Sequence, residues 1–237
     1  MIISNRYRYV FIEIPHTAST AIRNELIEYY DGVSIYSKHA PIDLFIKKAS
    51  NNEKSYFKFT SIRNPLDIVV TRYFKRKTDH QGFFTNSIHW KEFGGHITQK
   101  ARREFNFIKN NNATFAEYFK KFYKLPFDNY CNPSPNQFDF IIRYENLQED
   151  FSKLLKILGI RQIRDLPIIN KTEGKSNQYL DYYLPEIINK AIWVFAPSMK
   201  EWGYTFPEHW EGIKGYRSSQ FIFLLLKKRK YFIRQYK

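Results

Sequence analysis

The sequence lacks features that mark several common classes of protein. Its 237 residues include one cysteine, Cys131, so no disulfide can form within the chain and nothing in its cysteine content requires an oxidising compartment. The apolar run 221–226 has six residues, far fewer than the roughly 20 needed to cross a membrane. No cleavable apolar stretch precedes the strand expected at residues 9–12, so we predict no signal peptide and a cytoplasmic protein.

Metal ligands and acidic residues are also scarce. None of the six histidines forms an H-x-x-x-H pair, and no His/Cys cluster has the spacing of a metal site, so we predict no metal. Lys and Arg outnumber Asp and Glu by 38 to 23, which gives a net charge of +15 and favours anionic partners. Because the sequence has no zinc module, no RNP-like aromatic motif and no recognition-helix pattern, we do not expect nucleic acid as the partner.

Hydrophobic residues, in contrast, are plentiful. They make up 43% of the chain, and aromatic residues 19%, which excludes a disordered protein. The length and the continuous organisation predict one α/β domain over residues 1–215, followed by a basic amphipathic segment at 216–237. Two interpretations of that segment stay open: it lies on an anionic membrane surface, which would make the protein membrane-peripheral, or its apolar side packs on the domain.

The first informative motif is a strand-to-helix turn near the start of the chain. The apolar run 9–12 predicts a strand, and the loop Ile14-Pro-His-Thr-Ala-Ser-Thr-Ala-Ile22 follows it. Small residues let the backbone approach a ligand, and the first N–H groups of the next helix point at an anion placed there. The loop has neither the glycines nor the lysine of the pattern G-x-x-x-x-G-K-[ST]. Taken alone, it also fits an ordinary helix N-cap.

A second motif follows a second strand. Residues 57–62 have the pattern of a buried strand, with Arg63 at its carboxyl end. Asn64 and Pro65 then supply an N-cap and a proline at the first helical position. Thr71 lies two helical turns beyond the cap, so we expect its hydroxyl on the same side of the helix.

A third strand-to-helix turn is expected at residues 138–147. Tyr144-Glu-Asn-Leu147 follows the strand, Asn146 and Glu149 predict a capping pair, and Gly159 predicts the end of the helix. Glu145 is expected to have a structural role in this turn.

These three motifs, in this order, resemble those of sulfotransferases that use 3′-phosphoadenosine 5′-phosphosulfate (PAPS). The first loop is similar to the family's 5′-phosphosulfate loop, Pro-Lys-Thr-Ala/Gly-Gly/Ser-Thr-Ser, with His16 at the position of its lysine. Arg63-Asn64-Pro65 with Thr71 is similar to the 3′-phosphate motif, and residues 138–147 resemble the family's Tyr-Glu-Asn-Leu turn. Within the family, the chain most resembles the glycan O-sulfotransferases, including the 2-O-sulfotransferases of heparan-type chains.

The resemblance implies both a fold and an activity. The fold would be a three-layer, P-loop-like α/β fold with a central, mainly parallel sheet flanked by helices. The activity would be transfer of a sulfuryl group from PAPS, without a metal, to a hydroxyl of a carbohydrate, with an anionic glycan as the expected acceptor. Two alternatives stay open: a P-loop kinase of a nucleotide or small molecule, and a catalytically silent protein that binds PAPS or a glycan.

The resemblance also assigns roles to residues. Those expected to bind the donor are Pro15, His16, Thr17, Ala18, Ser19, Thr20, Ala21, Arg63 and Thr71. His16 would also act in catalysis, in place of the family's lysine. His39 matches the histidine that takes the acceptor's proton in the glycan branch; a surface or helix-capping histidine is the alternative. Lys75, Lys171 and Lys175 are expected to bind the acceptor.

Overall fold

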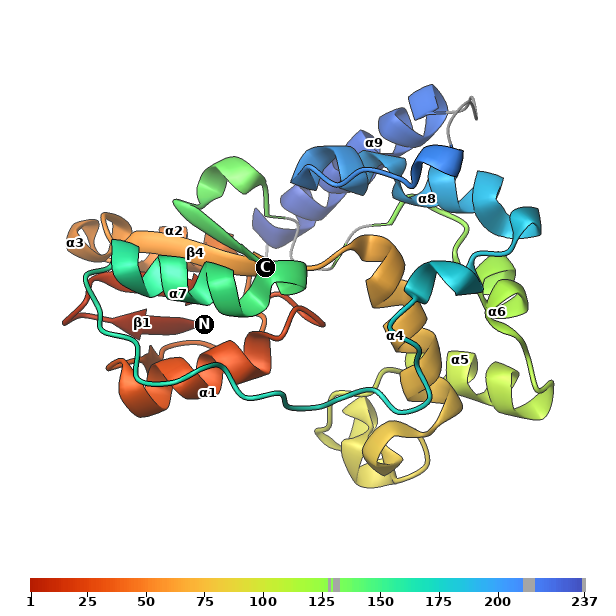
Figure 1. Cartoon of the computed structure of the whole chain (residues 1–237), viewed down its shortest axis with the longest axis horizontal. Coiled ribbons are helices and arrows are strands. Elements are labelled where there is room, and N and C mark those ends of the chain that lie inside the picture. Colours follow the sequence, from red (N-terminus) through yellow and green to blue (C-terminus); the bar gives the residue numbers. More distant parts are fainter. Residues whose placement is uncertain (128, 130–132, 211–215, 236–237) are drawn as a thin grey trace. The chain divides into compact units, whose positions relative to one another are not determined.

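The computed structural model describes residues 1–127, 129, 133–210 and 216–235, which fall into two compact units. Unit 1 comprises Met1–Asn64 and Asp128–Asn170, and unit 2 comprises Pro65–Phe127 and Lys171–Lys237. Figure 1 labels the elements along the chain. The boundary expected after residue 215 falls next to residues 211–215, which lie outside the described residues, so that boundary stays a prediction.

Unit 1 is built on a five-stranded sheet in the order β3-β1-β2-β4-β5. The strands are β1 (Ile2–Ser4), β2 (Tyr9–Ile12), β3 (Val33–Ser34), β4 (Phe57–Ile62) and β5 (Phe140–Arg143). β1 runs antiparallel to both of its neighbours, whereas β2 pairs with β4, and β4 with β5, in parallel. β2, β3, β4 and β5 therefore run in the same direction, which confirms the mainly parallel sheet.

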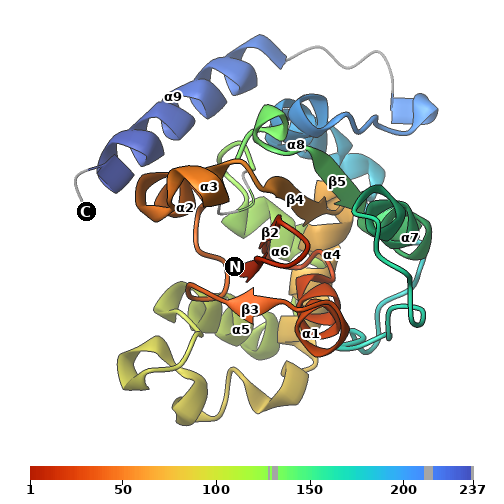
Figure 2. The ribbon, with the colours of Figure 1, turned by 90° about the vertical axis from the view of Figure 1, so that its left-hand side faces the viewer.

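Helices cover both faces of this sheet. They are α1 (Ser19–Tyr29) and α7 (Leu147–Ile157) on one face, and α2 (Ile42–Lys48) and α3 (Asn51–Lys54) on the other (Figure 2). Side chains of a strand alternate between the two faces. Tyr9 and Phe11 of β2 accordingly pack in one cluster with α1 and α7, while Val10 and Ile12 pack in another with α2. This confirms the predicted three-layer architecture.

The predicted strands agree with the observed ones. β2 and β4 have the predicted bounds: β2 is a continuous apolar run, and four consecutive residues of β4, 59–62, are buried, as expected of strands covered on both faces. β5 leads through the 3₁₀ turn Tyr144–Asn146 into α7, and Gly159 follows the helix with a left-handed φ of 68°. A further 3₁₀ turn, Pro135–Gln137, precedes β5.

The predicted capping pair at the start of α7 is wrong. Asn146 holds the N-cap position but makes no side-chain cap, because its backbone (φ −122°, ψ 35°) does not have the extended conformation of a capping residue. The side chain of Asp150 instead accepts a hydrogen bond from the backbone N–H of Arg143 at 2.8 Å. The end of β5 is thereby tied to the first turns of the helix.

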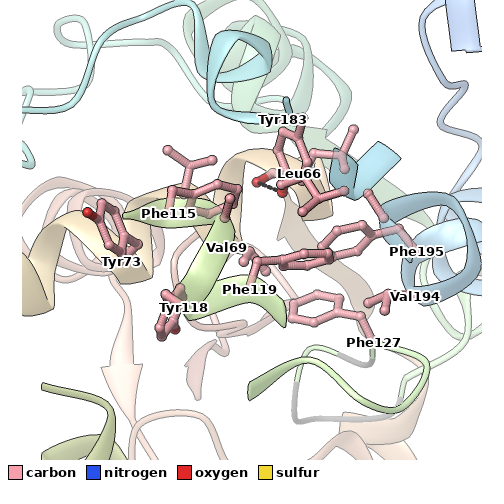
Figure 3. Packing of buried hydrophobic residues seen from close by; sticks show 14 of the residues in the cluster. Leu66, Val69, Tyr73, Phe115, Tyr118, Phe119, Phe127, Tyr183, Val194 and Phe195 are labelled. Carbon is pink, nitrogen blue, oxygen red and sulfur yellow. Dashed lines mark hydrogen bonds between the residues drawn. The ribbon is translucent and has the colours of Figure 1, made fainter. Parts of the chain in front are cut away.

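Unit 2 is helical in its described residues. Its helices are α4 (Pro65–Lys77), α5 (Gln99–Asn110), α6 (Phe115–Phe122), α8 (Pro185–Trp202) and α9 (Tyr216–Gln235), and its 3₁₀ turns are His80–Gly82, Ser87–His89, Lys91–Phe93, Tyr179–Tyr182 and Glu208–Trp210. Aromatic rings of Phe115, Phe119 and Phe195 form the centre of its core (Figure 3). The buried hydroxyl of Tyr183 donates to the carbonyl oxygen of Leu66 at 2.9 Å and so ties the start of α4 to this core.

The C-terminal helix α9 lies along α8. Ser219 Oγ donates to the carbonyl oxygen of Trp193 at 2.6 Å, and Phe223 is buried. The side of α9 that contacts α8 agrees with the interpretation in which the C-terminal segment packs on the domain. The side chains of Phe221, Leu224 and Leu225 are exposed, at 64%, 50% and 50%. Across the described residues, no helix combines the length and the apolar character needed to span a bilayer.

Candidate active site

The loop between β2 and α1 leaves the start of α1 without a side-chain cap. Ala18 holds the N-cap position in a left-handed conformation (φ 62°, ψ 14°). The buried hydroxyl of Thr17 donates to the carbonyl oxygen of Ile14 at 2.8 Å and contacts Ser61 Oγ of β4 at 2.7 Å, so it is used to hold the loop. The ordinary N-cap interpretation is therefore wrong for this helix. A helix start without a side-chain cap suits an anion, which can accept from its first N–H groups.

Backbone strain is concentrated at this loop. His16 and Ala18 have φ values of 67° and 62°, and His39, which contacts the residue preceding the loop, has a φ of 65°. A left-handed conformation costs a residue other than glycine roughly 1–2 kcal/mol, and such residues are frequent at ligand sites. The strain supports a functional loop.

His39 is held against the beginning of this loop. Its Nδ1 lies 3.0 Å from the carbonyl oxygen of Glu13. A carbonyl oxygen can only accept, so Nδ1 carries the proton and the Nε2 of the neutral ring carries the lone pair. Burial lowers the pKa of His39 below its ordinary value, and the charge of Lys38 acts in the same direction, while the bond to Glu13 opposes them. The ring is thus kept neutral and able to accept a proton at Nε2.

Arg63 also contacts the loop. Its Nη1 donates to the carbonyl oxygen of His16 at 3.4 Å, and its guanidinium lies 3.8 Å from the centre of the Tyr144 ring. The carboxylate of Glu145 accepts from the backbone N–H of Asn64 at 2.7 Å, in keeping with the structural role expected for it. Unit 1 therefore brings the loop, His39 and Arg63 together.

The structure adds two residues to this site that the sequence analysis did not identify. Lys38 Nζ donates to Thr20 Oγ at 2.6 Å, and Asn129 Nδ2 donates to the carbonyl oxygen of Pro15 at 3.0 Å. Two features of the sequence could have identified Lys38: it is adjacent to His39, and the loop lacks the lysine of the family. Nothing in the local sequence marks Asn129, which reaches the loop from 114 positions away.

The other predicted site residues belong to unit 2. Thr71 is buried in α4, and its hydroxyl has no hydrogen-bond partner among the described residues. Lys175 forms a largely buried ion pair with Asp67 at 2.8 Å. Lys75 is half-buried and Lys171 is exposed. The roles assigned to these residues stay predictions.

A central, mainly parallel sheet flanked by helices, with a half-buried histidine beside a helix start that has no side-chain cap, defines a three-layer α/β protein. A family profile described as "Sulfotransferase family" matches residues 1–187, and the chain belongs to that family. No group of three or more His, Cys, Asp and Glu side chains in the described part of the chain is placed to hold a metal ion.

Curated relatives have carbohydrate sulfotransferase names. The chain is 24% identical to carbohydrate sulfotransferase 14 of Danio rerio over 65% of its own length and 44% of the relative's. It is 20% identical to carbohydrate sulfotransferase 11 of Rattus norvegicus over 79% of its own length and 60% of the relative's. The chain thus spans about half the length of these relatives. No solved structure matches the chain. The heparan-type 2-O branch is not specified by these matches and stays a prediction.

Proposed function

We propose that the protein transfers a sulfuryl group from PAPS to a hydroxyl of a carbohydrate. The observation that carries the proposal is the combination, within unit 1, of the α1 start without a side-chain cap and a neutral histidine held against the same loop. The first feature suits the anionic donor, and the second supplies a base for the acceptor. Membership of the sulfotransferase family and the names of the relatives support this function over a kinase.

The donor would be bound through both of its ends. Backbone N–H groups of residues 17–20 would hold the 5′-phosphosulfate at the start of α1, whereas that of Ala21 donates to the carbonyl oxygen of Ala18 at 2.9 Å. Arg63 and Thr71 would hold the 3′-phosphate, which distinguishes PAPS from ATP. The buried Thr71 hydroxyl supports this role, because a buried donor without a partner costs about 1–3 kcal/mol that a phosphate oxygen would offset.

In the proposed reaction, the sulfuryl group passes from PAPS to the acceptor oxygen in one displacement. His39 Nε2 takes the proton of the acceptor hydroxyl, whose oxygen forms the new bond to sulfur. The bond between sulfur and the bridging oxygen breaks, and adenosine 3′,5′-bisphosphate (PAP) leaves with both electrons of that bond. His39 then releases its proton to solvent. His16 lies at the family's lysine position, where an N–H donor stabilises the leaving oxygen.

The acceptor would be an anionic glycan. The net charge of +15 supports such a partner because it raises the local concentration of polyanions. Within unit 2, Lys77, Lys100 and Arg103 are exposed. Their neighbours Arg76 and Arg102 form close ion pairs with Glu104 and Glu92, whereas Lys100 lies 4.0 Å from Glu104 with a side chain that is largely exposed. We assign the first glycan contacts to the exposed cations.

The protein would also contact an anionic membrane surface through α9. Its exposed Phe221, Leu224 and Leu225 are flanked by the exposed cations Lys228 and Arg229, and residues 216–237 contain no acidic residue. Contact between two copies through this face would bring like charges together, which disfavours a dimer. A cytoplasmic, membrane-peripheral location fits this proposal.

A turnover assay tests the function. PAPS and the protein are incubated with desulfated and sulfated polysaccharides, and PAP release is measured at low and high salt. We expect turnover with an anionic glycan that falls as salt rises, because exposed charges are screened over about 8–10 Å at ordinary ionic strength. Equal turnover of a neutral small hydroxyl compound at both salt concentrations would contradict the glycan assignment. Tight PAP binding without turnover on any acceptor would favour a silent binding protein.

A further inference from the structure

Lys38 brings a positive charge to the start of α1 from a different part of unit 1. It lies between β3 and α2, and its Nζ donates to Thr20 Oγ at 2.6 Å. Thr20 is the second residue of α1 and belongs to the loop that we assign to the 5′-phosphosulfate. The ammonium group therefore lies where the sulfuryl-bearing phosphate of the donor would bind.

This position is electrostatically unfavourable for an ammonium group in the absence of an anion. The N-terminus of a helix carries a partial positive charge of its own. No carboxylate among the described residues forms an ion pair with Lys38, whereas the nearby Arg23 is paired with Glu13. Lys38 is exposed as a whole, but partial desolvation lowers its pKa, and the charge of Arg23 adds to this effect, while that of Glu13 opposes it. A bound anion would stabilise both the ammonium group and the helix end.

The loop itself has no lysine. His16 stands at that position, and its backbone lies in the left-handed region with its carbonyl oxygen bound to Arg63. An imidazole offers one N–H donor when it is neutral, and no charge. The cation that the sulfotransferase loop normally carries is therefore missing from its usual place and present 22 positions later in the sequence, at Lys38.

We propose that Lys38 is a catalytic residue that takes over the function of the missing loop lysine. The inference rests on the proposed function. The Lys38 ammonium donates a hydrogen bond to the oxygen that bridges sulfur and the 5′-phosphate, and it stabilises the negative charge that grows there as the bond to sulfur breaks. It keeps its proton throughout, since His39 receives the proton of the acceptor. The adjacent residues Lys38 and His39 thus serve the leaving group and the nucleophile.

Substitution of Lys38 tests the inference. Lys38→Met should lower kcat for PAPS by about 10²–10³-fold, the usual effect of removing one preorganised donor to a developing oxyanion. Lys47→Met is the matched control, because Lys47 is an exposed lysine of the neighbouring helix α2 and the charge change is the same. The double variant His16→Lys with Lys38→Met should recover turnover, since it returns a lysine to the family's position. A merely structural lysine would not be rescued in this way.

Each outcome has a distinct meaning. If wild-type protein turns over PAPS and Lys38→Met matches Lys47→Met, the inference is wrong and the proposed function stands. Loss of turnover in Lys38→Met without recovery in the double variant, while PAP affinity measured by calorimetry is retained, would also overturn the inference. If wild-type protein neither binds PAP nor turns over PAPS, the proposed function fails and the inference fails with it.

Discussion

Three side chains of the candidate site are held by backbone oxygen atoms. His39 binds the carbonyl oxygen of Glu13, Arg63 that of His16 and Asn129 that of Pro15. Because these oxygens belong to Glu13 and to the loop that follows it, the loop conformation and the positions of the side chains depend on each other. A substitution that changes the loop backbone should therefore affect proton transfer and donor binding together.

Removal of His39 should affect turnover and leave donor binding intact. His39→Ala should lower kcat by about 10²–10⁴-fold, the usual contribution of a general base. His209→Ala, at an exposed histidine of unit 2, is the control and should leave kcat unchanged. PAP affinity, measured by calorimetry, should be the same in both variants. Unaltered turnover in His39→Ala would make His39 a surface or capping histidine.

The pH dependence of turnover should report the environment of His39. Only the neutral ring accepts a proton, and burial lowers its pKa. The acid limb of the kcat profile should therefore have its midpoint below the ordinary histidine value of about 6.5, and kcat should be constant above it until another group titrates. A midpoint above the ordinary value would mean that the charged ring is favoured, which contradicts a base whose pKa is lowered by partial burial.

Arg63 should determine the preference for the 3′-phosphate. We expect PAP to raise the melting temperature of wild-type protein more than 5′-AMP does, and Arg63→Ala to remove a charge-assisted contact worth about 1.5–3 kcal/mol. Arg63→Lys is the informative control. It keeps the charge but loses the planar group stacked on Tyr144, so it should recover part of the preference. Equal stabilisation of wild-type protein by AMP and PAP would contradict the assignment.

At the scale of elements, short apolar and β-branched runs made much of the sheet predictable. β2 is apolar throughout and marks its strand directly, while β4 alternates Phe57 and Phe59 with polar residues and ends at the buried Ile62. β1 and β3 have three and two residues, too few to show any period, and they were not predicted. Their order nevertheless explains why His39 lies near the loop, because β3 ends at the same edge of the sheet as β2.

The missed residues of the site share a physical cause. Lys38 and Asn129 reach the loop through contacts that span 18 and 114 positions of the sequence. Such contacts depend on the order of strands in the sheet, so the local sequence does not give the partner of either residue. The alternative interpretation of the loop as an ordinary N-cap is wrong for a related reason, since the hydroxyl of Thr17 bonds to Ile14 and to Ser61 of a different strand.

The start of α1 should tolerate glycine at Ala18. A left-handed alanine pays a steric cost that glycine does not, so Ala18→Gly should raise the free energy of unfolding by about 1 kcal/mol. The control Ala21→Gly, in the same helix, should lower it by at least about 0.5–1 kcal/mol because glycine is a poor helix former. Urea unfolding monitored by circular dichroism measures both. Equal destabilisation by the two substitutions would show that Ala18 is not strained.

At the scale of the whole molecule, the two residues assigned to the 3′-phosphate are close in the sequence. Arg63 directly follows β4, and Thr71 lies in the next element, α4. The two residues are joined by one continuous strand-to-helix connection through Asn64 and Pro65. The family match ends at residue 187, so α9 lies beyond it. The family match therefore assigns no role to α9.

The exposed face of α9 should bind anionic membranes. Phe221→Ser, Leu224→Ser and Leu225→Ser together should abolish co-sedimentation with vesicles of phosphatidylserine and phosphatidylcholine, because these side chains supply the apolar contact. Leu125→Ser, at an exposed leucine of unit 2, is the control. Lys228→Gln and Arg229→Gln should each weaken binding about 5-fold, which corresponds to roughly 1 kcal/mol per cation near an anionic surface.

Further measurements distinguish this membrane contact from a contact between two copies of the chain. Binding should fall with added salt and be weak on vesicles of phosphatidylcholine alone, since the cations need an anionic surface. PAPS turnover on a soluble acceptor should be unchanged in the triple serine variant, because α9 packs on α8 and none of its residues is assigned to the proposed site. Equal binding to neutral and anionic vesicles would contradict the electrostatic part of the proposal. A concentration-dependent dimer that the triple variant abolishes would identify a second copy of the chain as the partner of this face.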